Sequence, residues 1–316
     1  MSTPESVKEF HATVPVGSIH PTELHYYEWR PADAGERVRG VVHLAHGMVE
    51  HLGRYREFAQ FLASAGYAVV GADHRGHGLS ASRGAGLGYF GAGVSWEEVA
   101  HDLHDVRQYV KRRFPRVPYV LFGHSMGSFL VRTYLMHSAE GVAGAAIIGT
   151  GDWPGALGHA GLAAARALSA VRPAAPGKLL NALAFGPYEK PFEGRTHFDW
   201  LSRNEQNVQD YIADPLSGYL ASNSFFVQLL RGIHMVNSGD AAFALPPKLP
   251  LYFASGELDP VGGVAAVPQI ADRYRAGGSR DVTVNIYPDD RHEIFNETDR
   301  AQVWADFAAW LERVAR

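Results

Sequence analysis

A serine stands at the centre of the five-residue run Gly123-His124-Ser125-Met126-Gly127. The apolar run 119–122 before it predicts a buried strand, and the pattern of 128–135 after it predicts a helix. A serine on the sharp turn between such a strand and helix is held in a strained conformation that exposes its hydroxyl. Glycines flank the serine because a Cβ would clash where the strand and the helix pack closely. The run therefore predicts a nucleophilic serine, Ser125.

An activated serine needs a base, and the base needs an acid that orients it. In chains with this strand–serine–helix pattern, the acid and then the histidine follow the serine in sequence. Asp259 comes just after the expected strand 249–255, and His292 comes just after the expected strand 282–287. No other histidine follows Asp259, so the order selects His292 alone. Ser125, His292 and Asp259 are therefore the candidate catalytic residues.

Other carboxylates near these strand ends remain open as the acid. Glu257 is the main competitor, and Asp289 and Asp290 are less favoured. An aspartate before a proline, as in Asp259-Pro260, is also a common turn residue without a catalytic role.

An oxyanion hole is also expected, because negative charge on a reacting carbonyl oxygen needs backbone N–H donors. One donor should be the N–H of Met126, the residue after the nucleophile. The second should come from the loop that follows the expected strand 38–44, which reads His46-Gly47-Met48. Met48 is the best candidate, because Gly47 leaves room for the backbone to approach.

The elements that must position these residues alternate between strands and helices. Such alternation predicts a mostly parallel sheet covered by helices on both faces. The carboxyl ends of its strands are where catalytic groups gather. The expected strands are 10–14, 24–29, 38–44, 67–72, 119–122, 142–148, 249–255 and 282–287, and the expected helices are 55–65, 95–114 with Ser95 as N-cap, 128–135, 264–275 and 301–313.

The strand pattern stops between residues 151 and 240, where Ala, Gly, Pro, Asn and aromatic residues are frequent. We expect a mostly helical insertion here. The predicted organisation is a first core segment, 1–150, a helical cap, 151–240, and a second core segment, 241–316. Polar residues of the cap such as Asn204, Asn207 and Asn223 are candidates for holding a polar head group.

Several histidines raise the question of a metal site, above all in the run Asp73-His74-Arg75-Gly76-His77-Gly78. The spacings do not match zinc signatures, because His46 to Glu50-His51 has one residue too many and His292-Glu293 is not followed by a second histidine. The glycines suit a tight turn instead. We expect neither a metal nor a cofactor.

Bulk composition excludes several classes of function. The net charge of −4 does not favour nucleic-acid binding or a polybasic membrane contact, and the absence of cysteine excludes a thiol nucleophile and a disulfide framework. The amino-terminal residues do not read as a secretory signal, and no apolar run reaches the roughly 18 residues of a membrane span. We expect a cytoplasmic protein.

Further motifs support a family resemblance, because they fall in order around the serine: His46–His51, Arg54-Tyr55, Gly66-Tyr67, Asp73–Ser80, Gly256–Gly263 and Arg291-His292-Glu293. With these motifs the chain resembles the monoacylglycerol lipase and lysophospholipase branch of the α/β-hydrolases, which are serine aminopeptidase S33-type hydrolases. The resemblance covers roughly residues 20–150 and 246–316. The cap matches only through Asp214-Pro215-Leu216.

The resemblance implies the α/β-hydrolase fold and a serine hydrolase that cleaves monoacylglycerols or lysophospholipids through an acyl-enzyme. It implies a small-molecule or lipid ester as the partner, and it leaves room for a transient contact between the cap and a membrane surface. Three alternatives remain. They are a small-ester carboxylesterase, a hydrolase-fold protein that only binds a ligand, and a proline-iminopeptidase-like peptidase, which would need a cap carboxylate among Glu189, Glu193, Asp199, Glu205, Asp210 and Asp214.

Overall fold

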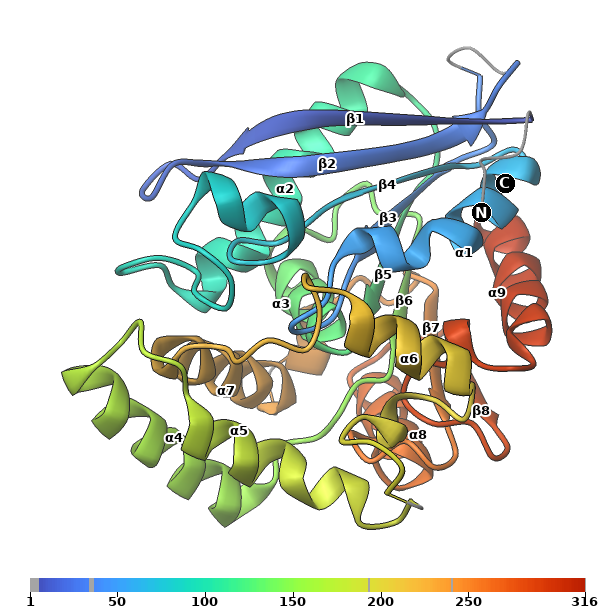
Figure 1. Cartoon of the computed structure of the whole chain (residues 1–316). Helices are drawn as coiled ribbons and strands as arrows, with labels where there is room; N and C mark the ends of the chain where they lie inside the picture. Colours follow the sequence, from blue (N-terminus) through green and yellow to red (C-terminus); the bar gives the residue numbers. More distant parts are fainter. Residues whose placement is uncertain (1–5, 34–36, 193, 240, 316) are drawn as a thin grey trace.

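A computed structural model describes residues 6–33, 37–192, 194–239 and 241–315. These residues form an eight-stranded sheet in the order β1-β2-β4-β3-β5-β6-β7-β8 (Figure 1). The strands from β4 to β8 run parallel, and β1 and β2 are antiparallel to their neighbours. The strand bounds are β1 Val7–Val16, β2 Thr22–Pro31, β3 Val41–Ala45, β4 Ala68–Ala72, β5 Tyr119–His124, β6 Gly144–Ile148, β7 Leu251–Gly256 and β8 Val282–Tyr287.

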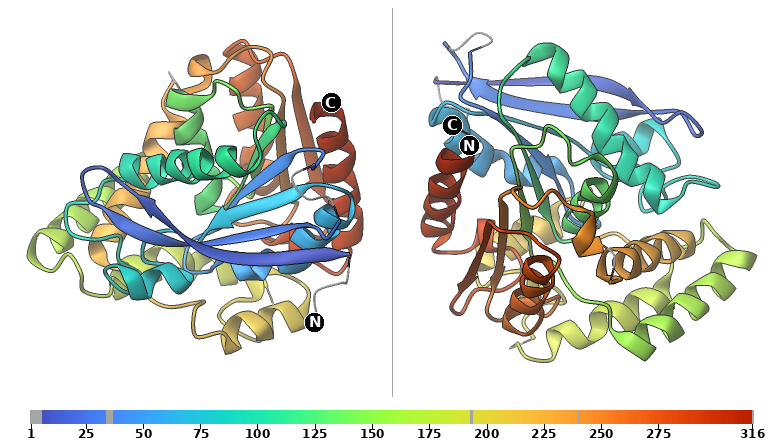
Figure 2. Two further views of the ribbon diagram at one scale, coloured as in Figure 1. Left: turned by 90° about the horizontal axis from the view of Figure 1, so that it is seen from above. Right: turned by 180° about the vertical axis from the view of Figure 1, so that it is seen from behind.

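Helices cover both faces of this sheet. One buried apolar cluster joins α1 and α9 to one face, and a larger cluster joins α2, α3 and α8 to the other (Figures 1 and 2). The central strands β3 to β7 are buried along their whole length, which explains their short, uninterrupted apolar sequences. The helix bounds are α1 Arg56–Ser64, α2 Trp96–Arg113, α3 Met126–Ser138, α8 Gly263–Ala276 and α9 Arg300–Val314.

The expected elements are all present, with shifts at their ends. The strand expected at 282–287 is β8 with the same bounds, whereas β1 and β2 each extend beyond the expected ranges. Ser95 is the N-cap of α2, as predicted. Its side chain accepts a hydrogen bond from the N–H of Glu98, whose own side chain bonds the N–H of Ser95. This reciprocal pair satisfies two backbone donors that the helix leaves unpaired, so it fixes where α2 begins.

Between β6 and β7 the chain forms helices, as expected for the predicted cap. They are α4 Gly155–Val171, α5 Lys178–Phe185, α6 Glu205–Ala213 and α7 Asn223–Asn237, with short 3-10 helices η3 Gly186–Glu189, η4 Asp199–Leu201 and η5 Ala241–Ala244. The core contains three more 3-10 helices, η1 Leu52–Tyr55, η2 Gly78–Arg83 and η6 Ile294–Asn296. The division into core and cap stays a prediction, and its boundary at residue 240 lies outside the described residues. No helix in the described ranges combines the length and the apolar character that crossing a membrane requires.

A buried arginine of α3 ties together the two ends of this helical segment. Arg132 donates to the Thr150 hydroxyl at 3.1 Å, where the chain leaves β6, and to the Val236 carbonyl and the Asn237 side chain at 2.7 Å, where α7 ends. Asn237 in turn donates to the Gly151 carbonyl at 3.2 Å. The point where the chain enters the helical segment and the point where it leaves are thus bonded to the helix that follows Ser125.

Candidate active site

Ser125 occupies a strained turn between β5 and α3. Its backbone has φ 53° and ψ −119°, in a region that L-residues rarely adopt, and its N–H donates to the Ile148 carbonyl at 2.9 Å. A Cβ at Gly123 would collide with the carbonyl oxygen of Gly127, and a Cβ at Gly127 would collide with that of Ala45. The predicted reason for these glycines is therefore correct. The turn leaves Ser125 only half-buried, although its neighbours are buried.

The structure brings His292 and Asp259 together. The Nδ1 atom of His292 lies 2.9 Å from Oδ1 of Asp259, and both residues are buried. The Ser255 hydroxyl donates to Oδ2 of Asp259 at 2.7 Å, and the N–H of Val261 donates to Oδ1 at 2.9 Å. Burial alone would raise the pKa of Asp259, but His292 and these donors hold that pKa below its usual value. The carboxylate is thus ionised and fixed against the imidazole.

The competing carboxylates have other partners. Glu257 accepts from the N–H of Asp289 at 3.3 Å, and Asp290 accepts from the Arg203 guanidinium at 2.7 Å. Burial raises the pKa of Asp290 to about 7, and the charges of Glu297 and Asp299 add to this effect. Among the described residues, Asp259 is therefore the carboxylate that bonds the His292 ring.

His292 also lies against the serine turn. Its ring centroid is 4.7 Å from that of His124, and its carbonyl is 3.1 Å from Nε2 of His124. A Cβ at Gly149 would stand 3.1 Å from Cε1 of His292 and 3.2 Å from Nε2 of His124, so a side chain at this position would crowd both rings. The close packing at Gly149 lets the histidine loop approach the turn that carries Ser125.

The two predicted oxyanion donors lie on either side of Ser125. Met126 is the first residue of α3, so its N–H has no acceptor within the helix and lies at the positive end of the helix dipole. On the other side, a Cβ at Gly47 would stand 3.3 Å from Cβ of Ser125. Met48 is the next residue along this loop. Their role as donors stays a prediction.

A buried ionic network holds these loops together, and the sequence analysis did not identify it. Arg54 donates to Glu50 at 3.0 Å and to both oxygens of Glu293 at 2.5 and 2.7 Å. Glu50 also accepts from the Gly47 N–H at 2.5 Å and from the Tyr55 hydroxyl at 2.8 Å. The loop that carries Gly47 and Met48 is thereby tied to Glu293, the residue after His292. The only sign of this network in the sequence was that Glu50 lies close to Met48 and that Glu293 lies next to His292.

His124, the residue before the nucleophile, belongs to the same network. Its Nδ1 atom lies 2.8 Å from the Tyr55 hydroxyl and 3.6 Å from Oε1 of Glu50. Burial lowers the pKa of His124, but the Glu50 carboxylate outweighs burial and raises the pKa above its usual value. The shift favours the protonated form of the residue directly before Ser125 more than in a free histidine.

Three of the histidines noted in the sequence, His46, His74 and His77, pack together as neutral rings. His46 and His74 have ring centroids 4.2 Å apart, and His77 lies 5.3 Å from His46. Burial lowers the pKa of His74 to about 3 and that of His77 to about 4, so both are uncharged at pH 7. In the described part of the chain, no group of three or more His, Asp or Glu side chains is arranged to hold a metal ion.

The helical segment covers the acid and the histidine with aromatic side chains. The Trp200 ring lies 5.1 Å from the His292 ring, and the Phe185 and Tyr188 rings pack on Trp200 at 5.9 and 5.2 Å. A cavity of about 470 Å³ opens between this segment and the core, and Asp259 contributes to its wall with Pro191, Phe192, Glu257, Leu258 and Arg291. Trp200 is one of several aromatic residues in this segment, and no neighbouring residue in the sequence indicated that it would contact His292.

The candidate head-group residues are engaged elsewhere. Asn204 is the N-cap of α6, Asn207 bonds Arg54 and Glu293, and Asn223 donates to the Arg172 carbonyl at 2.9 Å. Because each amide already has a structural partner, the expectation that they hold a head group has no support in this geometry.

Most of the cap carboxylates that a peptidase would need also have partners. Asp199 accepts from Thr196, Glu205 from Arg195, and Asp210 from Gln206. Asp214 lies 2.6 Å from Nε2 of His51. Glu189 has no hydrogen-bond partner for its carboxylate among the described residues, and Glu193 lies outside those residues.

Comparison with known families defines the class of this protein. Residues 36–299 match the family described as "Serine aminopeptidase, S33", so the chain belongs to that family. A crystal structure of a carboxyl esterase from Bacillus coagulans in complex with glycerol superimposes with a TM-score of 0.88, at 24% identity over 99% of this chain and 100% of the esterase. The predicted α/β-hydrolase fold is thereby confirmed.

Relatives of known name narrow the class. The chain is 28% identical over 311 residues to the monoacylglycerol lipase of Mycolicibacterium smegmatis, covering 97% of this chain and 98% of the relative. It is 26% identical over 304 residues to the human monoglyceride lipase, covering 90% and 85%. The protein is therefore an ester hydrolase of the monoacylglycerol lipase-like group.

Proposed function

We propose that Ser125, His292 and Asp259 are a catalytic triad that hydrolyses the carboxylic ester of single-chain lipids, with monoacylglycerols as the first candidate substrates and lysophospholipids as the second. The observation that carries the proposal is the 2.9 Å hydrogen bond between His292 and Asp259, beside a serine held on a strained turn. The names of the relatives, which are monoacylglycerol and monoglyceride lipases, support the substrate class.

The proposed mechanism begins with attack of the Ser125 hydroxyl on the acyl carbonyl, while His292 Nε2 takes the proton. Asp259 holds the proton of His292 on Nδ1 and stabilises the imidazolium that forms. The N–H groups of Met48 and Met126 stabilise the oxyanion. His292 then protonates the glycerol oxygen, which leaves, and a water molecule activated by the same histidine releases the fatty acid from Ser125.

The positive charge favoured on His124 adds to this mechanism. A cation beside Ser125 stabilises negative charge on the tetrahedral intermediate more strongly in a buried site than in water. The Glu50 carboxylate contributes most to keeping that cation in place, and the Glu293 charge and the His292 carbonyl act in the same direction. In this proposal, Glu50 and Arg54 are positioning residues, since they act through His124 and the oxyanion loop.

Dependence on acyl length tests the substrate class. A long chain bound in an apolar site gains about 0.8 kcal/mol per buried methylene, so kcat/KM is expected to rise by up to about fourfold per methylene over part of a series. Monoacylglycerols are expected to be cleaved faster than triacylglycerols, because the helical segment covers His292. Both series can be measured with p-nitrophenyl esters and with defined glycerides.

Each alternative function has a distinct outcome in these assays. A flat acyl profile, or a maximum at acetyl, would contradict the lipid proposal and indicate a small-ester carboxylesterase. Faster cleavage of prolyl arylamides than of any ester would indicate the peptidase, and Glu189 would then be the carboxylate to examine for binding of the amino group.

We further propose that the helical segment contacts a lipid surface transiently. The adjacent helices α4 and α5 leave large apolar side chains exposed, with Leu157 76%, Leu179 58% and Leu183 61% accessible. Exposed cations lie on the same segment, at Arg166, Arg172 and Lys178. Apolar groups with nearby cations favour shallow binding to an anionic bilayer.

Vesicle flotation tests this contact. The protein is expected to float with vesicles that contain anionic lipid, and the double variant Leu179→Ser, Leu183→Ser is expected to float several-fold less. Ile19→Ser is the matched control, because Ile19 is 72% accessible but lies in the turn between β1 and β2. Equal flotation of the double variant and the control would contradict the contact.

A further inference from the structure

The two edges of the sheet differ in how they are protected from pairing with another chain. The edge strand β1 carries Lys8, Glu9 and Pro15, which are residues that hinder edge-to-edge pairing. The opposite edge strand, β8, reads Val-Thr-Val-Asn-Ile-Tyr and has neither a charge nor a proline. Its first five residues are only half-buried. By this comparison β8 is the edge that is open to another strand.

The backbone of β8 presents alternate residues to this open edge. The N–H groups of Leu251 and Glu257, in and after β7, donate to the carbonyls of Asp281 and Tyr287. The backbone groups of the odd-numbered residues from 281 to 287 therefore point toward β7. The backbone groups of successive residues of a strand point to opposite edges, so the N–H and C=O groups of Val282, Val284 and Ile286 point away from β7, toward the open edge. The Val282 carbonyl accepts from Arg275 at 3.0 Å, which agrees with this direction. Within the described part of the chain, no side chain forms a hydrogen bond of this kind with the backbone N–H or C=O groups of Val284 and Ile286.

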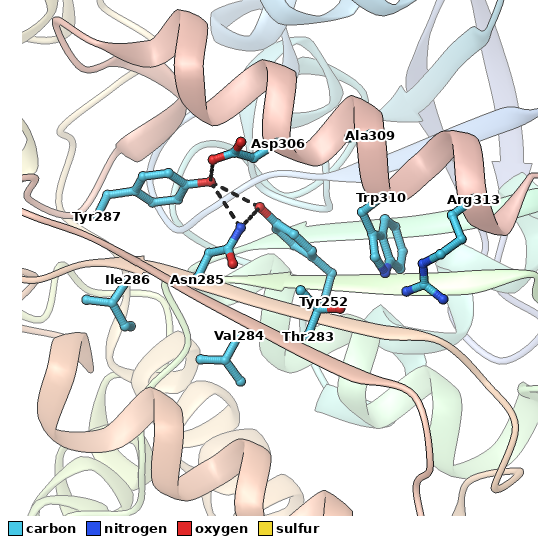
Figure 3. Close-up of a pocket in the computed structure, with 10 residues that line it drawn as sticks. All are labelled: Tyr252, Thr283, Val284, Asn285, Ile286, Tyr287, Asp306, Ala309, Trp310 and Arg313. Carbon is cyan, nitrogen blue, oxygen red and sulfur yellow. Dashed lines mark hydrogen bonds between the residues drawn. The ribbon is translucent and has the colours of Figure 1, made fainter.

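A groove of about 660 Å³ runs along the same edge, between β8 and α9. Figure 3 shows Thr283, Asn285 and Tyr287 on the side of β8 that faces α9, and Val284 and Ile286 pointing away from it. Asp306 lies at one end of the groove and Arg313 near the other (Figure 3). The indole N–H of Trp310, in the wall of the groove, is buried and has no acceptor among the described residues.

The two ends of β8 carry opposite charges. At the amino end lie Arg275, Arg280 and Arg313, with Asp272 and Asp281 as partners of two of them. At the carboxyl end lie Asp289, Asp306 and Glu257, and no lysine or arginine bonds these three carboxylates in the described residues. If a second copy of β8 paired antiparallel with the first, the arginine-rich amino end of each strand would lie beside the acidic carboxyl end of the other.

We propose that β8 pairs antiparallel with β8 of a second copy of this chain, about a two-fold axis at Val284, to form a continuous sheet across a homodimer. Val284 then faces Val284 of the second copy, and Val282 faces Ile286. These are β-branched pairs on one face of the sheet, which stabilise antiparallel strands. On the other face, Thr283 lies opposite Asn285. The pairing is self-complementary, as a two-fold interface requires.

The charges on α9 and the groove beside β8 are both compatible with this two-fold arrangement. Asp306 and Arg313 are seven residues apart on α9, so they lie on one side of that helix. The two-fold rotation brings the Arg313 end of one copy toward the Asp306 end of the other, which favours the antiparallel direction over the parallel one. The open groove gives room for the second copy beside Thr283 and Asn285. The proposal is independent of the triad, because the strand edge lies outside the Ser125 turn.

Cysteine cross-linking tests this arrangement sharply, because the chain contains no cysteine. Val284→Cys lies on the proposed axis, where paired Cα atoms are about 5.5 Å apart, within the range of a disulfide. Under mild oxidation it is expected to yield a covalent dimer that a reductant dissociates. Val282→Cys is the matched control. It is expected to stay uncrosslinked, because the two copies of residue 282 would be about 13 Å apart along the strands.

Light scattering after gel filtration tests whether the dimer forms without a cross-link. The wild-type protein is expected at twice the 34.5 kDa mass of one chain. Thr283→Lys places two like charges across the axis and is expected to be monomeric. Phe10→Lys places the same charge on β1 and is expected to remain dimeric. Thermal unfolding of both variants checks that they are folded. A wild-type monomer at about 100 µM, or cross-linking of both cysteine variants to the same extent, would overturn the proposal.

Discussion

The variant Ser125→Ala is expected to lose at least about 10⁴-fold in kcat for ester hydrolysis while remaining folded. The change removes one hydroxyl from a half-buried position, so packing is hardly affected. Without the nucleophile, only substrate binding and stabilisation of the oxyanion remain, and these supply a small part of the rate enhancement of serine hydrolases. Steady-state kinetics with a p-nitrophenyl ester measure the loss, and labelling with a fluorophosphonate probe is expected to disappear with it.

Ser128→Ala is the matched control for this experiment. The Ser128 hydroxyl lies in the first turn of α3 and donates to the Ser125 carbonyl at 2.6 Å. The change removes this hydroxyl and leaves that of Ser125 in place. We expect less than a tenfold change in kcat and normal probe labelling. Turnover by folded Ser125→Ala enzyme within tenfold of wild type would contradict the assignment of the nucleophile. Failure of the wild-type enzyme to react with the probe would point instead to an unactivated serine.

The variant Asp259→Asn is expected to lose on the order of 10⁴ in kcat, as such a change does in a serine protease triad. The carboxylate accepts the Nδ1 proton of His292 at 2.9 Å. An amide that turns its NH₂ toward His292 would favour the tautomer with its proton on Nε2, and that tautomer cannot take a proton from Ser125. The loss is expected in kcat, with little change in KM for a small ester, because Asp259 does not contact the acyl chain in the proposed mechanism.

Glu257→Gln distinguishes the two candidate acids. Glu257 bonds the backbone N–H of Asp289, so we expect its amide variant to retain activity within about tenfold. The reverse pattern, with Glu257→Gln the more damaging change, would show that the acid is Glu257. Comparison of the two thermal unfolding curves separates a loss of catalysis from a loss of fold.

The sequence alone was sufficient for the features that depend on neighbours along the chain. Strand and helix positions follow from apolar periodicity, and the N-cap at Ser95 follows from the residue type that precedes the helical pattern. The Ser125 turn also has a local signature, since its two glycines and the flanking strand and helix lie within a few residues of one another. The order of acid and histidine then selected His292 and favoured Asp259 as the acid, with Glu257 as its main competitor.

Tertiary structure decided everything that depends on segments far apart in the chain. It made Asp259 rather than Glu257 the partner of His292, because the loop after β7 turns only one of the two carboxylates toward the ring. It brought Arg54 to Glu293 and the Trp200 ring to His292 across long stretches of chain. It also made β8 an edge strand, because the order of the strands in the sheet depends on how the whole chain packs. Strand order and loop contacts depend on how the whole chain packs, and no local pattern encodes them.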